Sequence, residues 1–206
     1  MTGARVLQQL LSEGYRVRAL VRFPEKLDVQ SELLELVQGD ALELAAVQTT
    51  VEGCDAVISC LGIGGMGDGS KNTFLSESAK NIVAACPQGT SFSCISNTGV
   101  GNSIKAYPWH FRNVELRFFK NWKWFRAVLA DKQRMERVLR KSHLKYTIVR
   151  SPQILKTDEQ TGVELSADGR GIGNKVHVND LAAFLVESAL SHSGQRRIVS
   201  IASKNA

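Results

Sequence analysis

Apolar residues recur along this chain at two kinds of spacing, and the two kinds alternate from one end to the other. Apolar positions three and four residues apart indicate amphipathic helices, whereas short apolar or alternating runs indicate strands. The predicted helices are Ala4–Ser12, Ser31–Leu36, Leu42–Val51, Leu75–Cys86, Phe125–Lys141 and Leu181–Leu190. The predicted strands are Tyr15–Val21, Leu36–Gln38, Ala56–Leu61, Ser91–Ser96, Tyr146–Val149 and Arg197–Ile201.

Strands that alternate with helices predict an α/β fold, in which helices cover both faces of a doubly wound parallel sheet. The apolar run Ala56–Leu61 suits a strand buried on both faces. We expect Val163–Leu165 and Gly169–Gly173 to lie in a loop region, and Asn179 or Asp180 to cap the last helix. No repeat, low-complexity tract or linker divides the sequence, so residues 1–206 are expected to form a single domain.

The first predicted helix follows Met1, Thr2 and Gly3 directly, with no predicted strand before it. In nucleotide-binding α/β domains, the first strand and the Gly-rich turn after it hold a pyrophosphate. Gly3 matches only the last glycine of such a turn. We therefore expect the central first strand to be missing, the edges of its neighbours to be exposed, and cofactor affinity to be weaker than in a complete domain.

Composition indicates the class and location of the protein but not its activity. Hydrophobic residues make up 43% and charged residues 22% of the chain, as in ordinary soluble globular proteins. No apolar run has the length of a membrane span and no signal segment is visible, so we expect a cytoplasmic location and no membrane partner. The cysteines lack metal or redox spacing, so buried thiols are expected at Cys54, Cys60, Cys86 and Cys94.

Positive charge concentrates between Lys105 and Lys145, and the net charge of the whole chain is +6. Within this region the segment 102–126 interleaves aromatic and basic residues. Such a surface can bind nucleic acid through stacking and phosphate contacts, or it can form a flap whose aromatic side chains pack over an active site. No recognisable nucleic-acid-binding module accompanies the segment, so we favour the flap and expect no nucleic-acid partner.

Two basic residues lie at the position where folds of this kind contact the adenosine ribose of a dinucleotide. Arg22 directly follows the predicted strand that ends at Val21, and Lys26 lies close behind it. An acidic residue at this position binds the ribose hydroxyls of NAD, whereas a basic residue meets the 2′-phosphate of NADP. Arg22 therefore favours NADP(H), although a solvated surface arginine is an equal reading of its spacing alone.

Small or polar residues end the next two predicted strands: Asp40 and Ala41 after one, and Cys60, Leu61 and Gly62 after the other. Open α/β sheets bind ligands at the carboxyl ends of their strands. Asp40 could accept a hydrogen bond from an adenine amino group, and the turn at Gly62 could let the backbone approach a cofactor closely. Each position is also compatible with an ordinary strand-to-helix turn.

Lys132 interrupts the apolar stripe of the predicted helix Phe125–Lys141. A cation on an inward face needs a partner or a pocket. A nicotinamide ribose hydroxyl would serve as the partner, and the positive charge would stabilise negative charge developing on a substrate oxygen. Alternatively, Lys132 reaches solvent from the edge of the stripe, or pairs with Asp131 or Glu136.

Hydroxyl side chains end another predicted strand, at Ser96 and Thr98. A hydroxyl there could bond to a substrate carbonyl, although both residue types are also common in turns. No histidine stands at ligand spacing from a cysteine or carboxylate, so we expect no metal site. The histidines are His110, His143, His177 and His192.

A series of short segments carries a resemblance that extends over nearly the whole chain. The segments are Thr2–Leu7, Ala19–Leu27, Val37–Asp40, Gly53–Gly62, Ile95–Gly101, Leu129–Glu136, Tyr146–Arg150 and Val178–Ala182. In this order they resemble the NAD(P)H-binding, atypical short-chain dehydrogenase family that includes NmrA-like proteins and the biliverdin reductase B and flavin reductase type.

The resemblance implies a Rossmann-like fold that binds NADP(H) and transfers a hydride to a small carbonyl or planar heterocyclic substrate. It places Arg22 at the 2′-phosphate, Lys132 near the nicotinamide ribose and Ser96 at the serine position that ends the strand. It also implies that the nicotinamide pocket is lined by Ser151, Pro152 and Gln153.

Two positions depart from the family pattern. Asn97 follows Ser96 where a second serine is usual, and Val128 stands four residues before Lys132, where related enzymes carry a tyrosine. Without that tyrosine, the proton for a reduced substrate has to come from elsewhere, such as solvent.

Three functions stay open at this point, and an NADPH-dependent reductase is the one we favour. The alternatives are a non-catalytic NADP-binding redox sensor or inactive truncated isoform, and a basic nucleic-acid-binding protein. We expect a monomer that acts on a small-molecule substrate.

Overall fold

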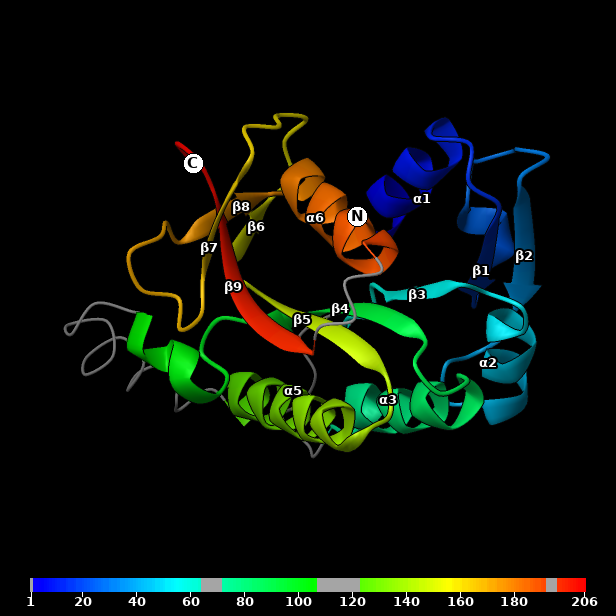
Figure 1. The fold of residues 1–206 in the computed structure, drawn as a ribbon, viewed down its shortest axis with the longest axis horizontal. Helices are drawn as coiled ribbons and strands as arrows, with labels where there is room; N and C mark the ends of the chain where they lie inside the picture. Colours follow the sequence, from blue (N-terminus) through cyan, green and yellow to red (C-terminus); the bar gives the residue numbers. More distant parts are fainter. Residues whose placement is uncertain (1, 64–71, 107–122, 192–195) are drawn as a thin grey trace.

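The computed structural model describes residues 2–63, 72–106, 123–191 and 196–206, along which strands and helices alternate (Figure 1). The helices are α1 (Thr2–Ser12), α2 (Leu44–Val51), α3 (Phe74–Ala85), α5 (Lys123–Lys141) and α6 (Val178–Leu190), with 3₁₀ helices η1 (Pro24–Lys26) and η2 (Gly101–Ala106). The strands are β1 (Val17–Val21), β2 (Leu34–Gln38), β3 (Ala56–Ser59), β4 (Ser91–Asn97), β5 (Lys145–Ser151), β6 (Gln153–Leu155), β7 (Val163–Ser166), β8 (Lys175–His177) and β9 (Arg197–Ser203).

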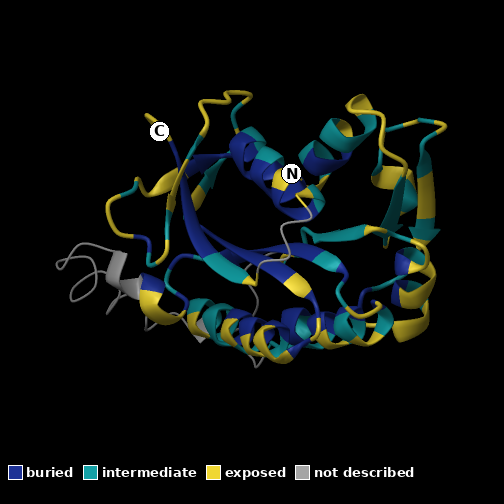
Figure 2. Ribbon diagram, viewed as in Figure 1, coloured by how far each residue is buried: buried dark blue, intermediate teal, exposed yellow. Residues whose placement is uncertain are grey.

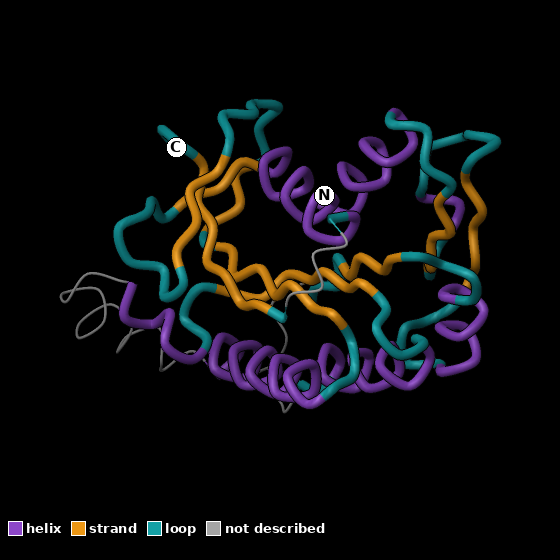
Figure 3. The backbone as a smooth tube through the Cα atoms, viewed as in Figure 1, coloured by secondary structure: helices purple, strands orange, loops and turns teal. Residues whose placement is uncertain are grey.

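A mostly parallel sheet lies at the centre of the fold, with the strand order β3-β4-β5-β9-β7. Strands β3, β4, β5 and β9 run parallel, and β7 runs antiparallel to β9. Helices α3 and α5 lie side by side over one face, while α1 and α6 lie over the other (Figure 1, Figure 3). The predicted α/β fold with helices on both faces of a parallel sheet is confirmed.

Two apolar clusters pack on opposite faces of this sheet, and Figure 2 shows the buried residues concentrated along its middle strands. The cluster under α3 and α5 includes Phe92, Leu139 and Ile148. The cluster under α1 and α6 includes Val149 and Leu185. Neighbours such as Ile148 and Val149 serve different clusters because successive side chains of a strand point to opposite faces. Strands β4 and β5 therefore lie in the core of the fold.

The sheet is interrupted between β1 and β3. Among the described residues β1 pairs with β2 alone and β3 pairs with β4 alone. Every residue of β1 and β3 is only half-buried, whereas most residues of β4 and β5 are buried. Exposed edges are expected from the sequence at this place. The run Ala56–Leu61, predicted to be buried on both faces, does contact an apolar cluster on each face, through Val57 and Ile58. Its residues are nevertheless only half-buried, since one edge of β3 has no neighbouring strand among the described residues.

The predicted helix Ser31–Leu36 is also wrong, since β2 occupies the second half of that segment. Leu34 pairs with Val17 at the start of a parallel ladder, and the backbone N of Val17 donates to the carbonyl of Leu33 at 2.8 Å. So short a segment is a poor nucleus for an isolated helix. Pairing with β1 therefore decides its conformation.

One predicted loop is a strand. Val163–Leu165 belongs to β7, which pairs antiparallel with β9. This strand lies at the sheet edge and Leu165 is 46% exposed, so the segment carries little of the apolar pattern that marks a central strand. The predicted loop Gly169–Gly173 does lie between β7 and β8.

Helix α6 begins earlier than predicted, after His177 at its N-cap. Asn179 and Asp180 therefore lie inside its first turn, and the prediction that one of them caps the helix is wrong. The Asp180 carboxylate instead accepts a hydrogen bond from the backbone N of Gly162 at 2.9 Å. Asp180 thus holds the segment before β7 rather than its own helix.

Much of the predicted basic aromatic flap, 102–126, falls on residues 107–122, which lie outside the described residues, so the flap stays a prediction. All four cysteines are free thiols; Cys86 and Cys94 are buried, as expected, while Cys54 and Cys60 are half-buried. In the described part of the chain, no helix is long and apolar enough to cross a membrane. Over the same residues, no cluster of His, Cys, Asp and Glu could hold a metal ion.

Candidate functional site

The predicted site residues follow the carboxyl ends of parallel strands. Arg22 follows β1, Asp40 lies beyond β2, Cys60 follows β3, Thr98 follows β4 and Pro152 follows β5. Strands of one parallel sheet end at the same edge, which is where open α/β sheets bind ligands. The interruption between β1 and β3 divides these residues into two groups, one at β1 and β2 and the other at β3 to β5.

Arg22 and Lys26 lie against the same aromatic ring at the end of β1. Arg22 Cζ is 5.9 Å and Lys26 Nζ is 4.3 Å from the centre of the Phe23 ring, within the range of cation–π contacts. Phe23 is 53% exposed, and both cations are exposed as well. The structure thus brings the two predicted basic residues together at a place that solvent and an anionic ligand can reach.

Asp40 and Ala41 form a turn that is fixed from two sides. Asp40 Oδ1 accepts a hydrogen bond from the backbone N of Leu42 at 2.9 Å. The carbonyl of Ala41 accepts one from Asn81 Nδ2 of α3 at 3.0 Å. One Asp40 oxygen therefore shapes the turn itself, and the predicted contact of Asp40 with an adenine amino group stays a prediction.

The start of α1 lies against the end of β3. A Cβ atom added to Gly3 would lie only 3.4 Å from Cys60 Cβ, whereas Gly62 is exposed with open space around it. Leu61 between them is half-buried. A helix N-terminus favours an anionic group, so α1 can face a phosphate here. Burial raises the pKa of Cys60 to about 12, so the Cys60 thiol stays uncharged at neutral pH.

Thr98 and Ser151 join the ends of β4 and β5. The backbone N of Thr98 donates to the Ser151 carbonyl at 3.0 Å, and Ser151 Oγ donates to the Ser96 carbonyl at 3.5 Å. Ser96, Thr98 and Ser151 are buried, whereas Pro152 is half-buried and Gln153 is exposed. Of the residues predicted on the nicotinamide side, Pro152 and Gln153 therefore present the most surface.

Lys132 lies on the inward face of α5 and is only 6% exposed, so most of its side chain is buried. No hydrogen bond or ion pair joins its Nζ to any other described residue. Burial lowers the pKa of Lys132 to about 8, against the opposing effects of nearby Cys94, Glu136 and Asp131. An ammonium group that is buried without a partner is typical of a ligand site.

The Glu136 carboxylate is occupied by groups other than Lys132. Arg150 donates from Nε to Oε1 at 3.0 Å and from Nη2 to Oε2 at 2.7 Å. Ser96 Oγ donates to Oε1 at 2.8 Å. All three side chains are buried, so this is a desolvated, bidentate ion pair. The hydroxyl hydrogen of Ser96 is consequently directed at Glu136.

Asp131 is likewise occupied, because it caps the neighbouring helix α3. Its carboxylate accepts hydrogen bonds from the backbone N of Leu75 at 2.8 Å and from Ser76 Oγ at 2.6 Å. Arg134 Nη2 lies 3.3 Å from Asp131 Oδ1. Thr73, the N-cap of α3, makes no side-chain capping bond. Neither acidic neighbour therefore pairs with Lys132.

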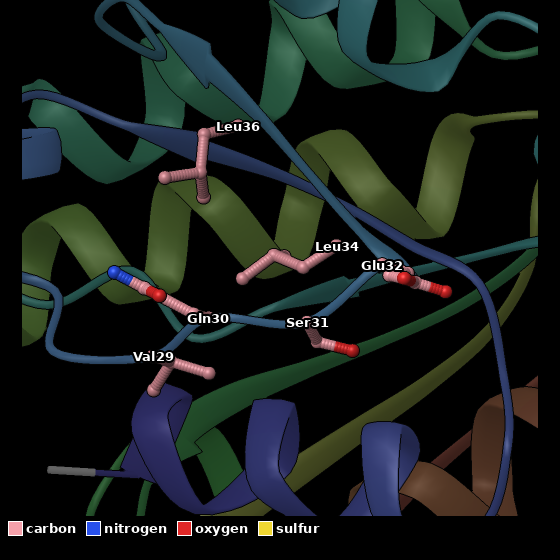
Figure 4. Close-up of a pocket in the computed structure, with 6 residues that line it drawn as sticks. All are labelled: Val29, Gln30, Ser31, Glu32, Leu34 and Leu36. Carbon is pink, nitrogen blue, oxygen red and sulfur yellow. The ribbon is translucent and has the colours of Figure 1, made fainter.

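A surface pocket of about 510 Å³ lies beside β2 (Figure 4). Its lining residues are Val29, Gln30, Ser31, Glu32, Leu34 and Leu36. Figure 4 shows Leu34 and Leu36 projecting from the strand, and Val29 and Gln30 projecting from the segment before it. None of the predicted site residues lines this pocket, so it is distinct from the edge at which those residues lie.

Comparison with known families identifies the class of cofactor that the chain binds. A family model described as NAD(P)H-binding matches residues 1–192. The chain belongs to this NAD(P)H-binding family. The resemblance carried by the ordered segments is thereby confirmed, and with it the assignment of NAD(P)H as the cofactor class.

Solved structures show that the fold of this NAD(P)H-binding protein is Rossmann-like. It is similar to an anaerobilin reductase from Escherichia coli O157:H7, at 19% identity and a TM-score of 0.73 over 100% of this chain and 93% of that chain. It is also similar to a short-chain dehydrogenase/reductase from Veillonella parvula in complex with NADP, at 16% identity and a TM-score of 0.71 over 100% and 91%. A third is an oxidoreductase from Lactococcus lactis, at 15% identity and a TM-score of 0.73 over 98% and 86%.

The residues present in this NAD(P)H-binding protein fit such a cofactor. NAD(P)H carries phosphates and ribose hydroxyls, which are partners for cations and for a helix N-terminus. Arg22 and Lys26 supply exposed cations at one end of the edge, and Lys132 supplies a buried ammonium with no bonded partner in the described part of the chain. The start of α1 lies at the end of β3.

Glu136 and Arg150 form a pair at the candidate site that the pattern of the sequence does not predict. Their signals are weak: Glu136 follows Lys132 by one helical turn, and Arg150 is the one charged residue of the run Tyr146–Ser151. Gly101 is a third, because its φ is +60° and a Cβ atom there would lie 2.9 Å from Arg150 Nη2. The guanidinium of Arg150 therefore requires a glycine in the loop after β4.

Proposed function

We propose that this protein is an NADPH-dependent reductase that acts on a small carbonyl compound or planar heterocycle. The observation that carries the proposal is the buried Lys132 ammonium group, which has no bonded partner among the described residues of an NAD(P)H-binding chain. A buried cation without a partner destabilises the folded protein unless a bound ligand supplies the partner. The bound cofactor supplies the hydride, and the residues of the chain bind and orient the cofactor and the substrate.

Arg22 and Lys26 support a preference for NADPH over NADH. Both are exposed cations at the carboxyl end of β1, and both lie against Phe23. A guanidinium binds a phosphate through paired, charge-assisted hydrogen bonds, which a ribose hydroxyl cannot match. In the proposed complex Arg22 contacts the 2′-phosphate and Lys26 adds positive charge beside it.

On the nicotinamide side, Lys132 binds a ribose hydroxyl, and its charge stabilises negative charge that develops on the substrate oxygen. Pro152 and Gln153 form the accessible wall of this pocket, with Ser151 behind them. Ser96 and Thr98 are the proposed hydroxyl groups at the end of β4. Because Ser96 donates its hydrogen to Glu136, its oxygen can meet a ligand only as an acceptor.

The proton that completes reduction comes from solvent in this proposal. Val128 occupies the position four residues before Lys132, so no tyrosine hydroxyl stands beside the lysine in α5. Ser96 and Thr98 are buried and the Ser96 hydrogen is held by Glu136. Water at the exposed Gln153 side of the pocket is therefore the nearest general source of a proton.

Replacing Arg22 with Asp tests the cofactor assignment. We expect NADPH affinity to fall about tenfold or more, since a bidentate phosphate contact becomes a repulsion of like charges, while NADH affinity changes little. Arg16→Asp, at an exposed residue before β1, is the matched control for the change in net charge. Unchanged NADPH affinity in Arg22→Asp, or an equal loss in Arg16→Asp, contradicts the assignment.

Turnover separates the reductase from a non-catalytic redox sensor. With a panel of quinones, aldehydes and flavins, we expect steady oxidation of NADPH with at least one acceptor, and its loss in Lys132→Met. NADPH binding without oxidation by any acceptor would favour the sensor.

A further inference from the structure

The environment of Lys132 raises a question that its burial alone does not answer. Glu136 follows it by one helical turn, on the same face of α5, and residues of opposite charge at this spacing are close enough to form an ion pair. Yet among the described residues the Lys132 ammonium has no bonded partner. Something has to keep the Glu136 carboxylate away from it.

Arg150 of β5 does so by taking both oxygens of that carboxylate. Its Nε and Nη2 lie 3.0 and 2.7 Å from Oε1 and Oε2 of Glu136. Ser96 Oγ adds a third hydrogen bond at 2.8 Å, and Arg140 Nη2 lies 3.8 Å from Oε2 on the outer side. A planar guanidinium suits this bidentate role and an ammonium does not, so Arg150 outcompetes Lys132 for Glu136.

We propose that Arg150 is a positioning residue that holds Glu136 and thereby leaves the Lys132 ammonium group unpaired for an anionic or hydroxyl-bearing ligand. The Asp131 carboxylate is withdrawn from Lys132 in the same way, by the backbone and hydroxyl of α3. The remaining neighbour, Cys94 of β4, is no counter-ion, because burial raises the pKa of its thiol. The inference concerns whether the Lys132 ammonium group is paired. It rests on the proposed function only in naming NADPH as the ligand.

The decisive variant is Arg150→Met, which keeps an apolar stem of similar length but frees the Glu136 carboxylate. Lys132 then becomes its ion-pair partner. We expect NADPH to bind about tenfold more weakly, and the pKa of Lys132 to rise from about 8. The pKa is followed through the Cε chemical shift of ¹³C-labelled lysine, assigned by its absence in Lys132→Met.

The matched control is the double variant Glu136→Gln with Arg150→Met. It lacks Arg150 as the single variant does, including the contact with Gly101, but it removes the competing carboxylate. We expect NADPH affinity to return to within about threefold of wild type and the pKa of Lys132 to fall again. If the double variant binds as weakly as Arg150→Met, Arg150 acts only through packing and the proposal fails.

Two further results would overturn the inference. If Arg140 takes over Glu136 in Arg150→Met, the titration of Lys132 stays as in wild type. If Lys132 already titrates near its ordinary value of 10.5 in the wild-type chain, it has an anionic partner and nothing is being kept from it. This last measurement uses the wild-type protein, and the Lys132→Met variant has to fold only so that the Lys132 signal can be assigned. Because the titration needs no cofactor, a wild-type chain that binds no NADPH would contradict the proposed function and leave this inference testable.

Discussion

At the scale of single residues, the burial of Lys132 lowers the stability of the folded chain. It is 6% exposed, and burial lowers its pKa from 10.5 to about 8. Between these values the unfolded chain holds more protons than the folded one, so the contribution of Lys132 to stability rises with pH across this window. Below about pH 8 the destabilising effect is complete.

Lys132→Met is therefore expected to raise the free energy of unfolding at pH 7 by on the order of 2 kcal/mol, because methionine keeps the apolar stem and removes the buried charge. The gain should shrink as the pH rises toward 10. Urea denaturation at pH 7 and pH 9.5 measures both effects. Lys80→Met, at an exposed lysine that pairs with Glu77 at 2.9 Å, is the control, and a Lys132→Met protein no more stable than wild type contradicts this account.

At the scale of elements, α5 contacts α3, β4 and β5 through polar side chains that lie within about one and a half turns of the helix. Asp131 caps α3, Lys132 lies near Cys94 of β4, and Glu136 joins β4 to β5 through Ser96 and Arg150. Periodicity predicts this helix and its inward face, since both depend on local spacing. It does not predict the partners, because α3 and β4 are distant from α5 in the sequence, and the contact with Arg150 of β5 forms only when the chain reverses direction after α5.

The cap on α3 is testable. Asp131→Ala removes the acceptor for the backbone N of Leu75 and for the Ser76 hydroxyl, and we expect a loss of about 2–4 kcal/mol in the free energy of unfolding. Ser76→Ala, which removes one donor and leaves the acceptor, should cost about 1 kcal/mol. Urea denaturation compares the two. Equal losses would mean that Asp131 contributes no more than its contact with Ser76.

The same scale explains why Ser31–Leu36 and Val163–Leu165 were assigned to the wrong structure by pattern alone. In each case a short segment takes its conformation from a partner strand, β1 for β2 and β9 for β7. Short apolar segments are ambiguous between helix and strand until that partner is known. Asp180 is a similar case, because its acceptor role toward Gly162 depends on a loop that folds back onto α6.

At the scale of the whole molecule, alternation of strands and helices is enough to predict the α/β fold. The position of Arg22, Asp40, Cys60 and Thr98 at strand ends follows from the same alternation. How the two groups of site residues come together around a ligand does not follow from it, since that depends on packing across the interruption between β1 and β3.

Hydrogen exchange tests the consequence of that interruption. Among the described residues β1 and β3 each pair on one side only and are half-buried, so we expect their amides to exchange at least about a hundredfold faster than those of β4 and β5. A paired parallel strand within a covered sheet opens only through large-scale unfolding. Equal protection of β1, β3, β4 and β5 would contradict an interrupted sheet.

The most direct test of the central claim, that a buried and unpaired Lys132 binds the anionic cofactor, is calorimetric titration of NADPH into the wild-type chain and Lys132→Met at pH 7 and pH 9.5. The cofactor phosphates keep their charge over this range, whereas Lys132, with a pKa of about 8, loses its proton. We predict that wild-type affinity falls about tenfold between the two pH values and that Lys132→Met binds weakly at both. Equal affinity of the two proteins at pH 7 would contradict the claim.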